Sequence, residues 1–314
     1  MTSVLPLRSE PSRPLLGDAP APAVKAGLGI AATARPGRFD AAKRLMRGAL
    51  PLAARKRLAR FLGRQRWLSA GSWWAHELLR DFAATDPNGY HRFLWANHLG
   101  YAETYEVAVR FGADRLHPTR RLLFEELQAC LTDLAIRPDA VDSVFEVGCS
   151  LGYNLRFLET DVFSAATVFD GCDIDGYAVA QGSAYLHAYG SRVRLFRADM
   201  GDLDAALGDC RYDVTLSAGV LMYLQRPEAH HVVASLLRHT KHLAVFAGLA
   251  DPDDDNATLQ TSRVRSSDGT FIHDIDAMVR RAGGRVVRRR WEGARLVEGN
   301  TVYFVFATPS GARP

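Results

Sequence analysis

The sequence predicts an α/β protein in which a mostly parallel sheet follows a helical N-terminal extension. Three observations support this. From Asp142 onward, short apolar runs alternate with helical segments, which is typical of a parallel sheet with right-handed crossovers. Before Asp142, the apolar residues recur at helical spacing. Only Glu292–Asn300 separates the last two apolar runs, which is too short for a crossover helix, so these two strands should pair antiparallel.

Seven strands are expected in this sheet, the last of them antiparallel, with helical stretches between the first five. They span Val144–Val147, Thr167–Cys172, Arg192–Phe196, Tyr212–Ser217, Leu243–Gly248, Arg285–Trp291 and Thr301–Ala307.

The extension is expected to contain three helices after Gly71. The first carries an apolar stripe that includes Leu78 and Phe82, and a turn at Asp86–Gly89 separates it from a second helix over Tyr90–Phe111. The third begins at Pro118, because proline suits the first turn of a helix. Its apolar side consists of Leu122, Leu123, Leu127 and Leu131.

Composition divides the chain of 314 residues into three parts. Residues 1–40 are rich in Pro, Ala and Gly without periodicity, so we expect a disordered tail. Residues 41–140 form the helical extension, which we expect to act as a lid. Residues 141–314 form the domain that should carry the ligand site, one core being enough for that length.

Charge is distributed unevenly. Residues 41–66 contain nine Lys or Arg and no acid, residues 1–40 carry a net +2, and the whole chain carries +4. The remaining residues, 67–314, are therefore acidic overall, which argues against nucleic acid as a partner. The basic stretch is either a solvated helical face or a contact with a membrane surface or acidic partner, and the first reading is favoured.

Four cysteines, Cys130, Cys149, Cys172 and Cys210, lie far apart and form no C-x-x-C pair, so neither a zinc site nor a disulfide framework is expected. The first residues do not follow the pattern of a secretory signal. We therefore expect reduced cysteines and a cytoplasmic protein. The sequence does not indicate an oligomeric state.

The most informative segment is Val144-Phe-Glu-Val-Gly-Cys-Ser-Leu-Gly-Tyr-Asn154. An apolar strand runs into Gly148, and Gly152 opens a helix. Glycine permits a tight turn and a close approach of a ligand, and the helix N-terminus behind it offers unpaired N–H groups. The spacing differs from the G-x-G-x-x-G of dinucleotide sites.

Acids follow the next two strands. Asp173 comes at the offset from the glycines at which a carboxylate can accept both hydroxyls of a ribose, and Asp170 and Asp175 are nearby alternatives, otherwise solvent-facing loop acids. Asp199 follows the third strand, where it could instead cap a short helix.

The glycine segment and the acids after the next two strands follow one another in the order found in a known family. Together they resemble class I S-adenosylmethionine-dependent methyltransferases of the bacterial, small-molecule type. The glycine segment resembles motif I, E/D-x-G-x-G-x-G, with Ser150 in place of the middle glycine. The resemblance covers Asp142 to Thr308 and implies a Rossmann-like sheet with S-adenosyl-L-methionine as cofactor. The cofactor contacts that it implies are Glu146, Gly148, Cys149, Ser150, Gly152, Asn154, Asp173, Ile174, Asp199, Met200, Ser217 and Ala218.

The resemblance also implies a role for the main contacts. Glu146 would orient the loop and the cofactor amine, and Asp173 would bind the ribose. Asp199 would accept a hydrogen bond from the adenine amino group, with Met200 against the ring, and Ser217 would lie near the sulfonium.

Methyl transfer needs a nucleophile held in line and, for a hydroxyl acceptor, a base. The candidate catalytic residues are His98, Glu103, Tyr223 and His273. Asn97, Tyr101 and Tyr105 are candidates for substrate contacts on a lid helix, which could equally be a buried packing helix. His273 could also cap or pack. The acidic run Asp251–Asp255 could bind a divalent cation, but a solvated loop is favoured, so no metal is expected.

The sequence thus favours a methyltransferase that acts on a small-molecule acceptor, at oxygen in preference to nitrogen, in natural-product or surface-saccharide biosynthesis. The chain lacks the N/D-P-P-Y/F motif of nucleic-acid base methylases after the fourth strand. One alternative is a binding or scaffold protein whose methyltransferase fold has lost catalysis. The other, an NAD-dependent oxidoreductase or epimerase, would need the missing dinucleotide glycine spacing.

Overall fold

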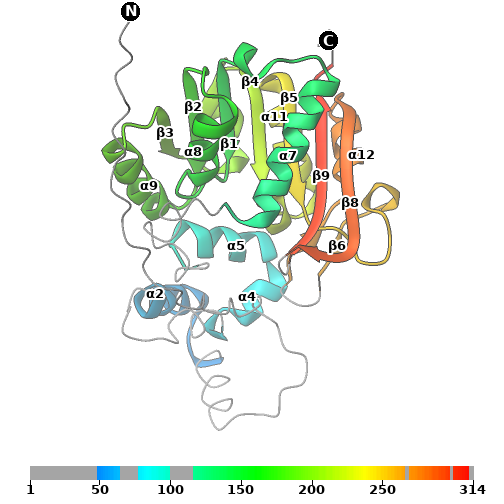
Figure 1. Ribbon diagram of the computed structural model, residues 1–314. Helices are drawn as coiled ribbons and strands as arrows, with labels where there is room; N and C mark the ends of the chain where they lie inside the picture. Colours follow the sequence, from blue (N-terminus) through cyan, green and yellow to red (C-terminus); the bar gives the residue numbers. More distant parts are fainter. Residues whose placement is uncertain (1–47, 64–76, 100–115, 266–268, 298–299, 311–314) are drawn as a thin grey trace, which may run out of the picture.

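A seven-stranded mixed sheet forms the centre of the protein in the computed structural model, which describes residues 48–63, 77–99, 116–265, 269–297 and 300–310 (Figure 1). The strand order is β3-β2-β1-β4-β5-β9-β8. The strands are β1 Ser143–Val147, β2 Val168–Asp173, β3 Val193–Arg197, β4 Tyr212–Ala218, β5 Thr240–Gly248, β8 Arg285–Val297 and β9 Asn300–Thr308.

The first five of these strands are parallel, and β9 pairs antiparallel with both β5 and β8. The predicted fold class, a Rossmann-like sheet with an antiparallel last strand, is confirmed. The chain order reverses at β1, which has β2 on one side and β4 on the other. In such sheets the crevice beyond the carboxyl ends of the strands is the usual place for a ligand.

The hairpin β8–β9 is longer than predicted. Glu292–Val297 continue β8, and Asn300 begins β9, so most of the expected loop is strand. Leu296 pairs with Thr301 beyond an irregularity in the register. A second, two-stranded sheet of β6 (Arg263–Val264) and β7 (Phe271–Ile272) was not predicted, because two-residue strands leave no periodicity to detect.

Helices cover both faces of the sheet, and Figure 1 shows α7 in front of it with α11 and α12 behind. The helices from Pro118 onward are α7 Pro118–Asp133, α8 Tyr153–Phe157, the π-helical turn η3 Leu158–Val162, α9 Gly176–Ala188, α10 Leu203–Leu207, α11 Arg226–Arg238 and α12 Ile275–Arg281. Short 3₁₀ turns span η2 Pro138–Ala140, η4 Met200–Asp202, η5 Leu221–Tyr223 and η6 Asn256–Thr258.

Alternate strand residues enter two apolar layers, because successive side chains of a strand point to opposite faces. In β9, Phe304 and Phe306 join the layer that contains α7, whereas Tyr303 and Val305 join the layer under α11 and α12. Helix α7 buries three of the four leucines predicted for its apolar side. These are Leu123, Leu127 and Leu131, while Leu122 is half-buried.

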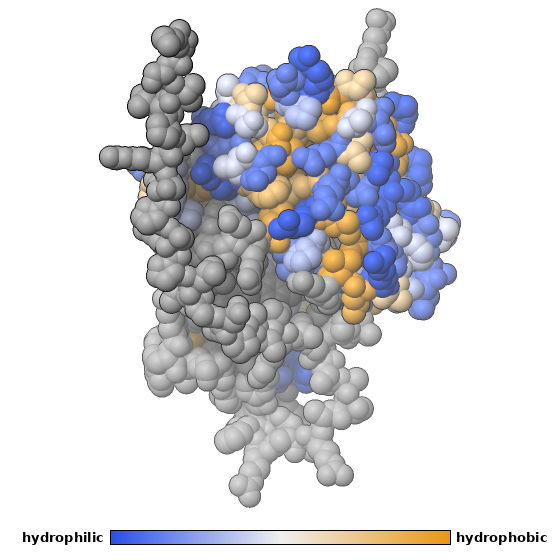
Figure 2. All heavy atoms as spheres, viewed as in Figure 1, coloured by the Kyte–Doolittle hydropathy of each residue, from blue (hydrophilic) through white to orange (hydrophobic). Residues whose placement is uncertain are grey.

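Strand β8 is an edge of the sheet, and charge protects it from pairing with another chain. The right-hand edge of the molecule in Figure 2, where β8 lies, is strongly hydrophilic. Part of this charge holds α7 in place. The carboxylate of Glu126 in α7 accepts hydrogen bonds from Arg288 Nε at 2.6 Å and Arg290 Nη1 at 2.8 Å, both in β8.

Before α7, the described part of the extension contains α2 (Leu52–Gly63), α4 (Arg80–Thr85) and α5 (Pro87–Ala96). The predicted turn at Asp86–Gly89 is the start of α5, because the Asp86 carboxylate caps the helix by accepting from Gly89 N at 2.8 Å. The single helix predicted over Tyr90–Phe111 is wrong in its continuity, and its part from residue 100 lies outside the described residues. Helix α5 stops at Ala96, and His98 has a left-handed φ of 55°.

The basic stretch is not a purely solvated face where the structure describes it. Arg55 in α2 is buried, donates to Leu78 O at 3.0 Å and pairs with Asp81. Lys56 Nζ lies 3.9 Å from the centre of the Phe82 ring. These basic side chains therefore hold α2 against α4. No described helix is both long enough and apolar enough to cross a bilayer.

Glu159 anchors the segment after α8, and a substitution there can measure how much this anchor stabilises the fold. Its buried carboxylate accepts from Ser191 Oγ at 2.5 Å, Arg192 N at 2.7 Å and Arg156 Nη1 at 2.7 Å, so it ties η3 to the start of β3. Burial alone would raise its pKa, but these hydrogen bonds lower the pKa of Glu159 to about 2. We expect Glu159→Gln to lower the free energy of unfolding at pH 7 by about 2–4 kcal/mol in urea titrations.

The pH dependence follows from the sign of this shift. The folded pKa lies below the unfolded value, so the stabilisation is complete above pH 4.5 and is lost as the pH falls towards 2. The difference between wild type and variant should shrink over that range. The exposed Glu125→Gln is the matched control. A difference that stays constant with pH would show that the carboxylate charge is not what matters.

Candidate functional site

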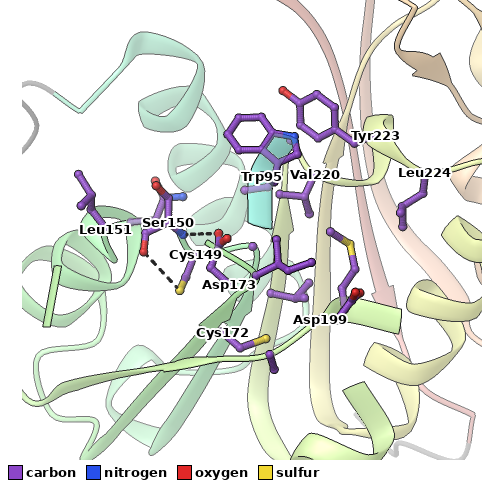
Figure 3. Close-up of a pocket in the computed structure, with 18 of the residues that line it drawn as sticks. Trp95, Cys149, Ser150, Leu151, Cys172, Asp173, Asp199, Val220, Tyr223 and Leu224 are labelled. Carbon is purple, nitrogen blue, oxygen red and sulfur yellow. Dashed lines mark hydrogen bonds between the residues drawn. The ribbon is translucent and has the colours of Figure 1, made fainter. Parts of the chain in front are cut away.

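A cavity lies at the carboxyl ends of β1, β2 and β4, where the strand order reverses (Figure 3). Its volume of about 200 Å³ is far larger than the 10–15 Å³ that a single water needs, so it is a ligand-sized space. Its walls come from the glycine turn after β1, the ends of β2 and β3, the loop after β4, and helices α5 and α7.

Most residues expected to contact the cofactor line this cavity. They are Gly148, Cys149, Ser150, Asn154, Asp173, Ile174, Asp199, Met200 and Ala218. Glu146, Gly152 and Ser217 lie behind the wall instead, and the side chains of Glu146 and Ser217 are fully buried.

The turn after β1 has three residues with left-handed backbone. Gly148 and Gly152 have φ of 71° and 79°, and a Cβ at Gly148 would lie 2.3 Å from Val220 Cγ1, so no larger residue fits there. Ser150, in place of the middle glycine, has a φ of 51°. It therefore adopts a conformation that costs an L-residue about 1 kcal/mol or more, which glycine would adopt freely.

Asp173 at the end of β2 offsets this cost. Its Oδ2 accepts from Ser150 N at 2.8 Å, and its Oδ1 accepts from Asp175 N at 2.8 Å (Figure 3). Burial raises the pKa of Asp173, although both backbone hydrogen bonds favour the charged form. The carboxylate thus joins the glycine turn to the start of α9 while it faces the cavity.

Asp170 and Asp175, the alternatives to Asp173, are neither solvent-facing nor in the cavity wall. Asp170 accepts from Arg194 Nε at 2.8 Å and from Tyr212 OH at 2.9 Å. Asp175 caps α9 by accepting from Tyr177 N at 3.0 Å. Both carboxylates are used for structure, which leaves Asp173 as the acid of this strand that meets the cavity.

Glu146 lies beneath the glycine turn. Its Oε1 accepts from Asn154 Nδ2 at 2.7 Å, and burial raises the pKa of Glu146 to about 7 against the effect of that hydrogen bond. Within the described residues, Glu146 Oε2 and Asn154 Oδ1 have no hydrogen-bond partner. Two buried acceptors next to a cavity are costly unless a donor from a ligand reaches them.

Asp199 and Met200 form the wall at the end of β3. Asp199 Oδ1 accepts from Gly201 N at 2.9 Å, so the residue does cap the short turn η4, as the simpler reading predicted. It also faces the cavity and forms an ion pair, in which Arg92 Nε lies 2.9 Å from Oδ2.

Helix α5 forms the roof of the cavity. Its His91, Arg92 and Trp95 line the space, and the rings of His91 and Trp95 lie 5.3 and 5.1 Å from the ring of Tyr223. Figure 3 shows Trp95 beside Tyr223, with Val220 just below the two rings. Asn88 Oδ1 also accepts from Gln225 N at 2.7 Å, so α5 is joined to the chain after β4.

Arg120 reaches the site from α7. Its Nη2 donates to Ala218 O at 2.8 Å, directly after β4, and the side chain lines the cavity. Sequence reasoning missed Arg120, His91 and Arg92. At helical spacing they look like ordinary polar positions, and the exposed Arg121 beside Arg120 carries the same signal.

Of the catalytic and substrate candidates that the structure describes, only Tyr223 lines the cavity. His98 Nδ1 lies 2.6 Å from Asp175 Oδ2, and Asn97 Nδ2 donates to Phe93 O at 2.8 Å, both outside the cavity wall. Tyr101, Glu103 and Tyr105 lie outside the described residues.

His273 is a structural residue, not a base. It is buried, its Nε2 donates to Leu221 O at 3.0 Å, and its Nδ1 accepts from Ser262 Oγ at 2.6 Å. Burial lowers the pKa of His273 to about 4. With both ring nitrogens engaged outside the cavity, it supports the loop that carries Tyr223, as the packing alternative predicted.

The acidic loop after β5 is held by arginines. Asp251 is buried and lies 3.0 Å from Arg263 Nη1, and Asp255 pairs with Arg289. Within the described ranges, no group of three or more His, Cys, Asp or Glu side chains is placed to hold a metal ion. The acids are thus not a simple solvated loop.

A protein-family model matches part of the chain. Residues 144–242, from β1 into β5, match a protein-family model described as a methyltransferase domain. No curated protein matches the chain.

Several solved structures are similar over much of the chain. Magnesium protoporphyrin IX methyltransferase from Synechocystis PCC 6803, with bound S-adenosylmethionine, shares 16% identity at a TM-score of 0.49, over 73% of this chain and 99% of that one. An S-adenosylmethionine-dependent methyltransferase from Clostridium acetobutylicum shares 11% at 0.45, over 67% and 98%. The glycopeptide N-methyltransferase MtfA shares 15% at 0.43, over 59% and 94%. Likenesses this weak say nothing about the substrate.

The family match begins at β1 and includes the glycine turn, Asp173, Asp199 and the loop after β4, all of which line the cavity. Residues 144–242 of this protein therefore match a methyltransferase-domain model, and they lie within a sheet of the Rossmann-like order β3-β2-β1-β4-β5-β9-β8.

Proposed function

We propose that the protein transfers the methyl group of S-adenosylmethionine to an oxygen atom of a small-molecule acceptor. The observation that carries the proposal is the roof of the cavity. Helix α5 covers the carboxyl ends of the strands, and Trp95 and Tyr223 meet above the turn that starts at Gly148. A roofed cavity suits a small acceptor, whereas a polymer would need an open groove.

The residues of the cavity fit the cofactor. Asp173 has a carboxylate for the ribose hydroxyls, Asp199 and Met200 could hold adenine, and the unpartnered acceptors of Glu146 and Asn154 could receive the ammonium of the methionine part. When bound, S-adenosylmethionine supplies an electrophilic methyl group on a sulfonium. The protein's task is then to orient the acceptor and to exclude water.

An acceptor hydroxyl must lose its proton as the new C–O bond forms and the S–C bond breaks. We assign this proton to His91, whose imidazole lines the cavity and lies against the Tyr223 ring, in place of His98 and His273. Tyr223 would orient the acceptor beside His91, with which its ring is in contact. A base is useful for an oxygen nucleophile and unnecessary for most amines, so this pair favours O-methylation.

The wider setting remains that of the sequence-based interpretation. We propose a cytoplasmic enzyme of natural-product or surface-saccharide biosynthesis, with residues 1–40 as a tail, 41–140 as a lid and 141–314 as the catalytic domain. A scaffold that has lost catalysis would need the structural hydrogen bonds of Asp173 and Asp199, but not the ligand-sized cavity that both of them line.

The direct test combines a ligand screen with a transfer assay. Candidate acceptors are screened by thermal shift with S-adenosylhomocysteine present, because an acceptor that completes the site should raise Tm further. Compounds that do so are incubated with S-adenosylmethionine carrying a labelled methyl group. We expect a labelled methyl ether. Label only on nitrogen would refute O-methylation, and label only on a protein or nucleic acid would refute the small-molecule acceptor.

Asp173→Ala should weaken the binding of S-adenosylhomocysteine, because it removes the carboxylate that would accept the ribose hydroxyls. We expect a loss of about 1.5–3 kcal/mol, roughly ten- to 150-fold in Kd, by isothermal titration calorimetry. Asp209→Ala, at an exposed position, should bind like wild type. Unchanged affinity in Asp173→Ala would show that the ribose lies elsewhere.

The affinity for S-adenosylhomocysteine should also depend on the protonation of Glu146. Because the pKa of Glu146 is raised to about 7, the carboxylate is largely neutral at pH 6 and largely ionised at pH 8. An ammonium prefers the ionised form, so affinity should increase by up to about tenfold over that range. Glu146→Gln should bind more weakly at pH 8 and lose the pH dependence. An equal dependence in both proteins would assign the titration to another group.

A further inference from the structure

An ion pair occupies the end of the cavity where adenine is proposed to bind. Arg92 Nε lies 2.9 Å from Asp199 Oδ2, and Arg92 Nη2 lies 3.4 Å from Oδ1, which already accepts from Gly201 N. The donor that reaches both oxygens from the cavity is therefore the guanidinium, since Arg92 lines the cavity. An adenine amino group would have to approach Asp199 through the position that this guanidinium occupies.

The guanidinium also covers the turn η4. A Cβ added at Gly201 would lie 3.1 Å from Arg92 Nη2, so the guanidinium packs directly on this backbone. Arg92 lines the same cavity as Met200, the residue proposed to face the adenine ring. The arginine therefore fills space at this end of the cavity as well as pairing with the acid.

The pair is of a kind that a ligand can displace. The side chain of Arg92 is 56% exposed and that of Asp199 is 23% exposed, and ion pairs with so much access to water contribute little. The backbone of α5 is held independently of this pair, by Asn88 to Gln225 and by the rings of His91 and Trp95 on Tyr223. Release of Arg92 needs only a movement of its side chain, while the helix stays in place.

We propose that Arg92 is a built-in competitor of the cofactor, whose guanidinium holds Asp199 until the adenine amino group replaces it. This inference rests on the proposed cofactor site and adds a regulation of it by the N-terminal extension. Because such coupling is reciprocal, cofactor binding also removes one of the contacts that join α5 to the catalytic domain. If Arg92 instead stayed in place and contacted the bound adenine, its removal would weaken cofactor binding.

The test is a double-mutant cycle on the full chain, with S-adenosylhomocysteine as the probe in isothermal titration calorimetry. Arg92→Ala should bind the probe about two- to fivefold more tightly than wild type, the gain expected from removal of an exposed ion pair. In an Asp199→Asn background, where there is no ion pair to break, Arg92→Ala should have no effect. Arg121→Ala removes an exposed arginine from α7 and is the matched control.

Each outcome has one meaning. Weaker binding by Arg92→Ala would show that Arg92 is a cofactor contact, and unchanged binding would show that the ion pair is irrelevant to the site. Either result overturns the inference and leaves the cofactor site intact. Tighter binding that persists in the Asp199→Asn background would overturn it too, because the effect would not pass through Asp199. Failure of every protein, wild type included, to bind the probe would refute the cofactor site and the inference with it.

Discussion

The cavity depends on one buried carboxylate, that of Asp173. It accepts backbone N–H groups from Ser150 on the glycine turn and from Asp175 before α9, so it holds two loops from different strands against each other. Its position follows from the sheet, because β1 and β2 are parallel neighbours and end at the same edge. Without this acid, the left-handed conformation at Ser150 would be uncompensated, and the wall that faces the ligand would lose its shape.

The roof of the cavity, formed by α5, and its floor, formed by the turn after β1, are held by different kinds of contact. The floor is a turn fixed by backbone hydrogen bonds, in which Gly148 N and Cys149 N both donate to Cys172 O. The roof consists of side chains of α5 that lie on the loop after β4, and buried His273 supports that loop from below. A rigid floor and a roof of aromatic and charged side chains suit an enzyme that binds one constant cofactor and a specific acceptor.

Much of the fold could be predicted because its signals are local. Seven apolar runs, glycines at 148 and 152, and an acid at 173 are all visible along the chain, and the strands and the turn formed where these residues predicted them. The end of α5 could not be predicted. The residues from Trp95 to Tyr105 continue a helical pattern, but the chain leaves the helix at Asn97 to bring His98 against Asp175, a partner 77 residues away.

Tertiary contacts also explain why some residues of the site were wrongly predicted or missed. His273 follows a short strand and precedes a helix, as an active-site residue would, and only the fold shows that both its nitrogens are used. Arg92 and Arg120 could not be predicted as site residues, because the sequence alone does not distinguish them from solvent-exposed arginines on a helix. Only the tertiary structure places them beside loops from distant parts of the chain. Local pattern thus identifies the part of the site that touches the constant cofactor better than the part contributed by the extension.

Helix α7 connects the outermost strand of the sheet to the cavity. Its Arg120 end holds the carbonyl of Ala218 at the cavity, and two turns further along, Glu126 is clamped by Arg288 and Arg290 on the outermost strand. The helix is therefore attached both to the edge strand of the sheet and to the loop that borders the cavity. Charge changes at Arg288 or Arg290, on the outermost strand, would weaken the attachment of α7 and so affect the cavity through Arg120.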